Sequence, residues 1–465
     1  MNPSYTELSE SVQEPASDQL HLFKEAVTAE VVSAEKDSFS DPAFGSNKLL
    51  PVHRWVPWVA GYSSDFVRSV LERYLPHPGV VLDPFAGVGT TLVEAEMMGH
   101  EALGFEINPY AALASRVKVE AVRLDADALA LTVKSLRSFY EGKVSNGYVP
   151  ESAPPPGFRT RVGFYSPAVL RKVLIVQDFI EHQTDPLIRD AVQLAFAATM
   201  VRYSNYSYEP SLSTRQGAGK SDIKDADVLS PIIEKLQQMV ADVRWLQAQD
   251  VSPGNGKVIA ASFFECQDHM DDGSADVLIT SPPYVNNYHY IRNTRPHLYW
   301  LGFVNKPKDT KAMEHANFGK YWQTVRDGDP VHLEMNLPES ELPDKLNQLR
   351  ALHPEKGVYG GAGWANYVAT YFNDCRRFAE ATRYALRPGG RAFIVVGNSI
   401  LQGIDFRVDR YLGEIAEATG LELVEISIPR ETRVGNSIIS SDVRVTKAKK
   451  GHALYEAVVH LRRPE

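Results

Sequence analysis

Residues 80–91, VVLDPFAGVGTT, decide the fold of this 465-residue chain. A short apolar run ends in Asp83, a glycine-rich turn follows, and Thr90 leads into a mostly apolar stretch that stops at Gly99. This pattern predicts a strand, a tight loop and a helix. Such a loop lets backbone N–H groups approach a ligand closely, and the N-terminus of the helix favours negative charge. Taken alone, the stretch indicates a nucleotide-like ligand.

The sequence on either side of this loop extends the pattern into an α/β unit. Capping and apolar spacing predict a helix over 63–75, a second strand spans 102–107, and Pro109 opens another helix. Alternating strands and helices imply a parallel sheet. Glu106 ends the second strand, where an acid can accept hydrogen bonds from ribose hydroxyls; a solvated strand-end acid is the alternative. Leu92 replaces the third glycine of a dinucleotide fingerprint, which disfavours a nicotinamide dehydrogenase.

The period of the apolar residues divides the rest of the chain into core segments and insertions. Residues 125–250 carry mostly helical patterns, whereas strand patterns return at 257–261 and 275–280. Two late runs, 421–428 and 455–461, are expected to close the sheet as an antiparallel hairpin. We therefore predict an α/β fold with a flexible arm over 1–45, a ligand-binding core part over 46–124, a helical insertion over 125–250, a second core part over 251–304, a second insertion over 305–364 and a last core part over 365–465.

Composition and charge exclude several classes of protein. Hydrophobic residues make up 44% and charged residues 23% of the chain, as in ordinary globular proteins. No apolar run is long enough to cross a membrane and no signal-peptide pattern opens the chain, so we expect a cytoplasmic protein with no membrane partner. Cys266 and Cys375 are the only cysteines; we expect buried thiols and no metal site. The net charge of −9 leaves only local basic clusters as candidate faces for nucleic acid.

The segment Ser281-Pro282-Pro283-Tyr284 follows the predicted strand at 275–280, at the sheet edge where ligands bind in open α/β folds. Its prolines fix φ and remove two N–H donors, so the loop is rigid and rich in acceptors. The Ser281 hydroxyl oxygen and the Pro282 carbonyl can accept hydrogen bonds from an aromatic amine and orient its lone pair, while Tyr284 offers a face for base stacking. A turn or a proline-rich ligand is the competing interpretation of these residues taken alone.

Together, the two loops resemble the amino-methyltransferase family of DNA methyltransferases. Residues 83–90 match the family's cofactor motif D-P-F-x-G-x-G-T, and residues 281–284 match its catalytic motif [S/D/N]-P-P-[Y/F]. Residues 53–74 resemble the helix that flanks the cofactor, and the likeness leaves out the arm and both insertions. The resemblance implies a Rossmann-like class I methyltransferase core that depends on S-adenosylmethionine. It also implies double-stranded DNA as the substrate, with the target nucleotide flipped out of the duplex.

The resemblance assigns roles to residues in both loops. It makes Ser281, Pro282, Pro283 and Tyr284 the catalytic loop, and it places Phe66, Asp83, Phe85, Ala86, Gly87, Gly89, Thr90 and Glu106 around the cofactor, with Glu106 on the ribose. The family usually has an acid after the third strand that contacts the adenine amine. This chain has Ala260-Ala261-Ser262-Phe263 there, so we predict that Ser262 or Asp268 substitutes for that acid.

The first residue of the catalytic loop bears on the target base. Serine there resembles the cytosine-N4 enzymes of the family, whereas aspartate or asparagine resembles the adenine-N6 enzymes. We therefore predict a site-specific methyltransferase that modifies cytosine N4 by direct in-line transfer, with adenine N6 as the alternative. Cytosine-C5 methylation needs a cysteine nucleophile, conventionally after a proline, and neither cysteine has that setting.

Two further alternatives concern the class of protein. RNA guanine-N2 methyltransferases carry similar motifs, but Val285 replaces the glycine that follows their catalytic loop. An inactive cofactor-binding module that recognises DNA is suggested by the acid missing at Ala261, and the intact Ser281 loop argues against it.

Sequence recognition is expected to fall to the insertions, with 125–250 as the candidate recognition segment and 305–364 as a candidate DNA contact. Polar, aromatic and basic side chains in two runs can read base edges or bind phosphates; a solvated surface is the competing interpretation for each. A cognate restriction endonuclease or defence-system proteins are the further partners that the resemblance raises. The candidate DNA contacts are Arg202, Tyr203, Asn205, Arg215, Lys220, Asn287, His289, Arg292 and Arg295.

Overall fold

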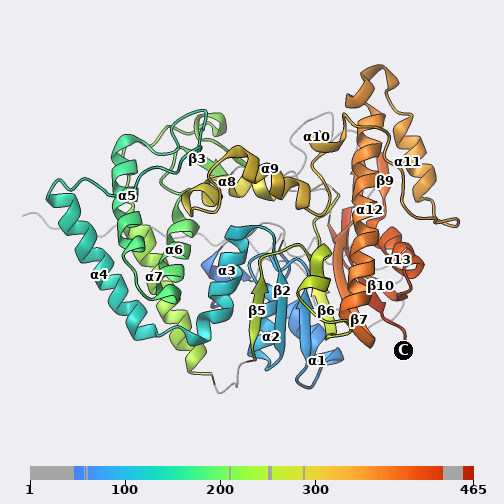
Figure 1. Ribbon diagram of the computed structural model, residues 1–465, viewed down its shortest axis with the longest axis horizontal. Helices are drawn as coiled ribbons and strands as arrows, with labels where there is room; N and C mark the ends of the chain where they lie inside the picture. The colour runs from blue at the N-terminus through green and yellow to red at the C-terminus, as the bar shows by residue number, and fades with distance from the viewer. Residues whose placement is uncertain are drawn as a thin grey trace, which may run out of the picture. The chain divides into compact units, whose positions relative to one another are not determined.

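Seven strands form one sheet in the order β10-β11-β7-β6-β1-β2-β5. The computed structural model describes residues 47–56, 58, 61–208, 211–249, 254–285, 289–432 and 454–465, and this sheet runs through their middle (Figure 1). Neighbouring strands from β5 to β7 are parallel, whereas β11 runs antiparallel to both β7 and β10. The strands are β1 Val80–Asp83, β2 Glu101–Phe105, β5 Gly256–Ile259, β6 Ala275–Thr280, β7 Leu386–Gly397, β10 Glu422–Thr432 and β11 Leu454–Arg462.

This topology confirms the predicted α/β class and the antiparallel closure by the last two strands. The strand order changes direction at β1, because β2 lies on one side of it and β6 on the other. Such a reversal opens a crevice beyond the carboxyl ends of the strands. The fold is therefore the Rossmann-like class I methyltransferase core that the resemblance implied.

Helices cover both faces of the sheet. Alternate residues of β1 point to opposite faces, so Val81 packs with Phe66 of α1 while Leu82 packs with Phe378 of α12. The longer helices are α1 Ser64–Tyr74, α2 Thr90–Met97, α3 Pro109–Val119, α4 Ala126–Ser145, α5 Pro167–Glu181, α6 Pro186–Thr199, α7 Leu229–Gln247, α8 Tyr290–Trp300, α9 Pro307–Ala316, α11 Leu342–Arg350, α12 Gly361–Ala385 and α13 Val408–Ala418. None of the helices in the described part of the chain is long and apolar enough to span a membrane.

Residues 125–250 form a helical unit beside the β5 edge of the sheet (Figure 1). Helices α4 to α7 share one hydrophobic core, and a short hairpin of β3 Tyr206–Tyr208 and β4 Leu212–Thr214 follows α6. Helix α8, which follows the Ser281 loop, packs into the same core through Leu298 and Tyr299. The Ser281 loop is therefore followed in the chain by a helix that packs in the core of the helical unit.

Residues 305–364 form α9, the short helix α10 Trp322–Val325, α11 and the 3-10 helix η7 Pro354–Tyr359. Leu342, Leu346 and Leu349 of α11 pack into the core that α12 and α13 build on the sheet. The second insertion is thus part of the folded body. The predicted arm over 1–45 lies outside the described residues.

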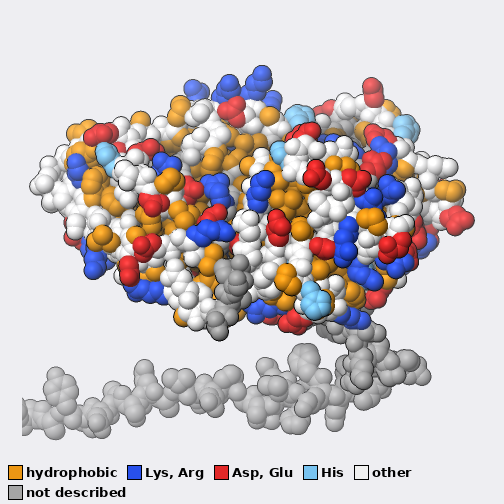
Figure 2. All heavy atoms as spheres, turned by 60° about the horizontal axis from the view of Figure 1, so that its bottom comes forward, with side chains coloured by type: hydrophobic (Ala, Val, Ile, Leu, Met, Phe, Trp, Pro, Cys, Tyr) orange, Lys and Arg blue, Asp and Glu red, His pale blue; other side chains and the backbone are white. Residues whose placement is uncertain are grey.

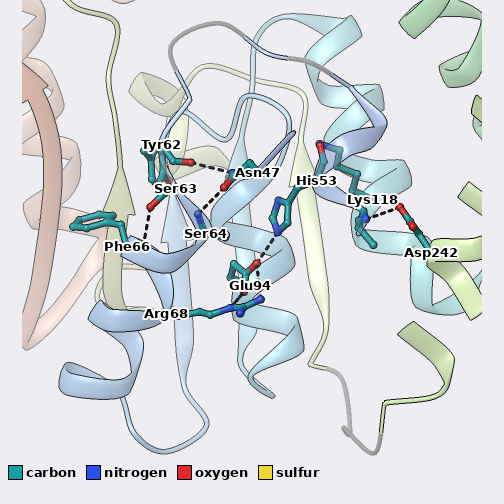
Figure 3. A network of polar contacts seen from close by, with 11 residues as sticks. Asn47, His53, Tyr62, Ser63, Ser64, Phe66, Arg68, Glu94, Lys118 and Asp242 are labelled. Carbon is teal, nitrogen blue, oxygen red and sulfur yellow. Dashed lines mark hydrogen bonds and ion pairs between the residues drawn. The ribbon is translucent and has the colours of Figure 1, made fainter. Parts of the chain in front are cut away.

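A buried polar network ties the segment before α1 to both the core and the helical unit (Figure 3). His53, in the 3-10 helix η3 His53–Trp55, contacts Glu94 of α2 at 2.6 Å, and Lys118 of α3 donates to the His53 carbonyl at 3.1 Å. Asp242 of α7, only 1% exposed, accepts hydrogen bonds from Arg54, from the Trp55 indole and from the Val52 amide. The chain that leads to Trp58 is thereby fixed on two sides.

Candidate active site

A cavity opens at the carboxyl ends of β1, β2, β5 and β6, where the strand order reverses. Ligands of open α/β folds bind at this place. Both loops singled out in the sequence contribute to the wall. The lining residues are Trp58, Pro84, Phe85, Gly87, Phe105, Glu106, Ile107, Asn108, Ser262, Phe263, Phe264, Ser281, Pro283, Tyr290, Ala316, Asn317 and Phe318.

The glycine loop after β1 needs its glycines for both conformation and space. Gly87 has φ +51° and Gly89 has φ +84°, values that residues with a side chain rarely adopt. A Cβ at Gly89 would lie 2.6 Å from the Ser115 hydroxyl oxygen, and one at Gly87 would lie 3.3 Å from the Trp58 indole nitrogen. The loop therefore packs closely against α3 on one side and exposes its backbone to the cavity on the other.

Glu106 holds the glycine loop against the end of β2. One carboxylate oxygen accepts from the Gly87 amide at 2.9 Å and the other from the Asn108 amide at 2.7 Å. Each oxygen keeps a lone pair for a further donor such as a ribose hydroxyl. Burial, with a smaller contribution from the charge of Asp83, raises the pKa of Glu106 to about 7 against the lowering effect of the amide hydrogen bonds.

This pKa predicts a pH-dependent affinity for the cofactor. With a pKa of about 7, Glu106 is mostly protonated at pH 6 and mostly ionised at pH 8, and an ionised acceptor forms the stronger hydrogen bonds to ribose. We expect the affinity for S-adenosylhomocysteine, measured by calorimetry, to rise about tenfold from pH 6 to pH 8.

Glu106→Gln should bind more weakly and show no such rise. Glu96 and Lys118 also have pKa values of about 7, shifted chiefly by burial, but they lie outside the cavity and remain in that variant. A rise of the same size in Glu106→Gln would contradict the assignment of the pH effect to Glu106.

Asp83 links the glycine loop after β1 to the Ser281 loop after β6. Its carboxylate accepts hydrogen bonds from the Thr280 hydroxyl at 2.6 Å, the Tyr62 hydroxyl at 2.8 Å and the Phe85 amide at 3.1 Å. Thr280 is the residue immediately before Ser281, so one buried carboxylate sets the ends of β1 and β6 relative to each other.

Asp83 and Phe66, for which a place around the cofactor stays a prediction, are both buried. Asp83 is 1% exposed, and Phe66 is fully buried in the core, where its ring meets Tyr62 edge-on. Ala86, Gly89 and Thr90 are also buried behind the cavity wall, while Phe85, Gly87, Glu106 and Ser262 line it. Asp83 and Phe66 are thus positioning residues, and Tyr62, which the sequence did not single out, completes their network.

Ser281 lines the cavity, and its hydroxyl proton forms a hydrogen bond within the protein. The hydroxyl donates to the Val395 carbonyl on β7 at 3.0 Å. Its oxygen therefore keeps lone pairs that can accept a hydrogen bond from an amine. The end of the loop is held by the Tyr367 hydroxyl of α12, which donates to the Val285 carbonyl. Pro283 lines the cavity beside Ser281, and Pro282 is buried behind it.

Tyr284 packs against the end of β7. Its hydroxyl donates to Glu456 of β11 at 3.2 Å, and a Cβ at Gly397 would lie 2.9 Å from the ring. Burial, with the charge of Glu456, raises the pKa of Tyr284 well above its ordinary value. The ring does not line the cavity, so stacking on a target base stays a prediction.

The two cysteines are the buried thiols that the sequence predicted. Burial raises the pKa of Cys266 to about 11 and that of Cys375 well above its ordinary value. Both thiols are therefore protonated near neutral pH, which is unsuited to a nucleophile.

The candidate DNA contacts fall into two groups. Arg202, Lys220 and Arg292 are exposed, although Arg202 pairs with Glu234 at 3.6 Å. The hairpin β3–β4 docks on α8, since the Tyr208 hydroxyl donates to the Asn293 carbonyl at 2.9 Å. This contact brings the run over 202–220 to the helix whose first residue, Tyr290, lines the cavity.

The second group has internal structural roles. Tyr203 is 2% exposed and Asn205 is 8% exposed. The Asn205 side chain donates to the Gly163 carbonyl and accepts from the Ile223 amide, and DNA contact by these two residues stays a prediction. Arg215 donates to the Ser221 carbonyl and Arg295 to the Arg159 carbonyl. His289 lies edge-on to Tyr321, and burial with the nearby Arg292 lowers its pKa to about 4. Asn287 lies outside the described residues.

Basic and acidic side chains are mixed on the face of the molecule seen in Figure 2.

An aromatic pair at the cavity was missed by sequence reasoning. The rings of Trp58 and Tyr290 are stacked with centroids 6.1 Å apart, and both residues line the cavity. Trp58 precedes α1 and Tyr290 begins α8, so only the tertiary structure brings them together. Tyr290 lies in the aromatic and basic run that follows the Ser281 loop in the sequence, whereas no local pattern marks Trp58.

The residues present fit S-adenosylmethionine. Glycine backbone at Gly87, the partly hydrogen-bonded carboxylate of Glu106 and the aromatic side chains of Phe85 and Phe263 offer partners for a charged amino acid group, a ribose and a purine. Glu106 and Gly87 would hold the cofactor, which supplies an electrophilic methyl group when bound.

The chain is similar in sequence to known DNA methyltransferases. Residues 49–116 match the N6_N4_Mtase family, described as DNA methylase. The Type II methyltransferase M.BsoBI of Geobacillus stearothermophilus is 22% identical over 432 residues, which cover 85% of this chain and 83% of that protein. The Type II methyltransferase M.AvaI of Nostoc sp. is 23% identical over 420 residues, covering 85% and 84%.

Among solved structures, the rRNA methyltransferase aviRa from Streptomyces viridochromogenes shares 9% identity, with a TM-score of 0.30 over 90% of this chain and 92% of that one. A TM-score this low adds nothing to the fold assignment, which rests on the strand order. Together with the two motifs and the cavity they build, the family match over residues 49–116 and the similarity to Type II methyltransferases support a relation of this chain to the amino-methyltransferase family of DNA methyltransferases.

Proposed function

We propose that this protein transfers a methyl group from S-adenosylmethionine to cytosine N4 in double-stranded DNA, at a specific sequence. The observation that carries the proposal is the meeting of Ser281 and Glu106 in one cavity, at the point where the strand order reverses. Glu106 provides a ribose site, and Ser281 provides an acceptor for the amine that receives the methyl group.

In the proposed reaction, residues of this chain position the amine relative to the methyl donor. The Ser281 oxygen holds the amine so that its lone pair faces the methyl donor, and the Val395 and Thr280 contacts keep that loop in place. Holding the two reactants in this geometry supplies the rate without a covalent intermediate on the protein. The aromatic pair Trp58 and Tyr290 offers a surface on which a flipped base can stack.

The serine at position 281 favours cytosine over adenine as the target base. In the family that this chain resembles, the cytosine-N4 enzymes have serine as the first residue of this loop. Adenine N6 is the second candidate. The stretch from Ala275 to Tyr284 is consistent with either amine, since both present N–H donors to the same acceptors.

DNA is favoured over RNA as substrate by the relatives. M.BsoBI and M.AvaI are Type II methyltransferases that align with 85% of this chain. The exposed Arg202, Lys220 and Arg292 lie on the hairpin side of α8 and offer phosphate contacts. A cognate restriction endonuclease is the partner that Type II relatives suggest.

The test is nucleoside mass spectrometry after incubation with S-adenosylmethionine and double-stranded DNA, with transfer RNA and ribosomal RNA as parallel substrates. We expect N4-methylcytosine in the DNA and no methylated nucleoside in the RNA. N6-methyladenine would show that the base is wrong but the amine class right, whereas methylation of RNA alone would overturn the proposal.

A further inference from the structure

One end of the cavity lies beyond Glu106, away from the catalytic loop. The sheet order β6-β1-β2-β5 sets Ser281, Glu106 and Ser262 in that sequence along the carboxyl edge. If the ribose is bound at Glu106 and the transferred methyl group faces Ser281, the adenine ring extends toward Ser262 and the end of β5. The adenine site is therefore built around this third position.

No charged acceptor for the adenine amine is present there among the described residues. Glu106 is the only carboxylate among the described lining residues, and Asp268 does not line the cavity. Ser262 does line it, but its hydroxyl oxygen already accepts from the Phe264 amide at 3.3 Å. An exocyclic amine buried without an acceptor costs about 1–3 kcal/mol, so a further partner is expected.

Asn317 lines the cavity at this end and comes from the second insertion. It is the C-cap residue of α9. The ring centroid of its neighbour Phe318 lies 6.0 Å from that of Phe264, after β5, and 5.2 Å from that of Phe85. These ring contacts place the turn across the cavity wall between the loop after β1 and the loop after β5.

Buried contacts hold the turn that carries Asn317. Asp374 of α12, 4% exposed, accepts from the Gly319 amide at 3.0 Å and pairs with Lys320 at 3.6 Å. Lys320 in turn donates to the Asn317 carbonyl at 2.6 Å, and Phe318 is 3% exposed. The backbone of Asn317 is thus fixed, while its carboxamide forms no hydrogen bond within the part of the chain that is described.

We propose that Asn317 recognises the adenine ring of the cofactor, in the role that the residue at Ala261 cannot fill; this inference rests on the proposed function. The carboxamide oxygen accepts from the exocyclic amine while its NH₂ group donates to the adjacent ring nitrogen, a match of one donor and one acceptor on each side. The second insertion is then part of the cofactor site and not solely a DNA contact.

Calorimetry with two ligands tests this assignment. S-adenosylhomocysteine and its 6-deamino analogue, which carries hydrogen in place of the adenine amine, are titrated into the wild-type protein and into Asn317→Ala. We expect Asn317→Ala to weaken S-adenosylhomocysteine binding about tenfold. The wild type should prefer S-adenosylhomocysteine to the deamino analogue by about the same factor, and Asn317→Ala should have lost this preference.

His315→Ala is the matched control, because His315 is exposed on the same helix and does not line the cavity. It should bind both ligands as the wild type does. Equal affinity of Asn317→Ala and wild type for S-adenosylhomocysteine would overturn the inference, as would a lower rate of methyl transfer with unchanged affinity, which would assign Asn317 to the target base. Absence of binding to the wild type would instead refute the proposed function.

Discussion

Ser281→Ala should lower the rate of methyl transfer about 100-fold and leave the affinity for S-adenosylhomocysteine within twofold of wild type. The Ser281 hydroxyl donates to the Val395 carbonyl, which leaves its oxygen as the acceptor that orients the amine in the proposed reaction. Alanine removes this acceptor without adding bulk to the cavity. Single-turnover kinetics with labelled S-adenosylmethionine measures the transfer step, and calorimetry measures the affinity.

Ser274→Ala provides the control for this experiment. Ser274 is exposed just before β6, at the opposite end of the strand from Ser281, and bonds only the Asp271 carbonyl in the described structure. Its variant should transfer methyl groups at the wild-type rate. A Ser281→Ala enzyme with more than half of the wild-type rate would contradict the role of the serine.

Asp83→Ala is expected to reduce cofactor affinity and methyl transfer together, and to lower the free energy of unfolding by about 3 kcal/mol. The variant leaves the Thr280 hydroxyl, the Tyr62 hydroxyl and the Phe85 amide without their buried acceptor. Because these groups belong to both loops, neither loop keeps its position. Denaturant unfolding, calorimetry and transfer assays follow the three effects.

Asp276→Asn separates this coupling from a general loss of stability. Asp276 also joins β1 to β6, since it accepts from the Val80 amide at 2.7 Å, but it does so at the amino ends of the strands. Its variant should lose stability and keep its cofactor affinity. If Asp83→Ala lost stability alone, as Asp276→Asn should, Asp83 would not be a positioning residue of the site.

Local patterns in the sequence were enough to predict the core strands β1, β2, β5 and β6, the helix α1 and both loops. The apolar runs that end in Asp83 and in Thr280 are β1 and β6, and the helix over 63–75 is α1. These elements follow from residues close together in the chain, where capping and apolar spacing act. The positive φ angles at Gly87 and Gly89 likewise agree with the prediction of a tight loop.

Contacts between distant residues could not be read from such patterns. Asp83 meets Thr280 across 197 positions of sequence, and this pairing makes Asp83 a buried link between loops. Trp58, Tyr290 and Asn317 reach the cavity from three separate segments. Tyr203 carries a side chain suited to DNA, yet the packing of α5 and α6 buries it.

Methylome sequencing of a bacterial host that expresses the chain tests the central claim most directly, because it reports the modified base and its sequence context at once. We predict N4-methylcytosine at one recurring sequence in cells with the wild-type protein and none in cells with Ser281→Ala. Genomic DNA without any modified base that depends on Ser281, from cells that contain the folded protein, would contradict the account.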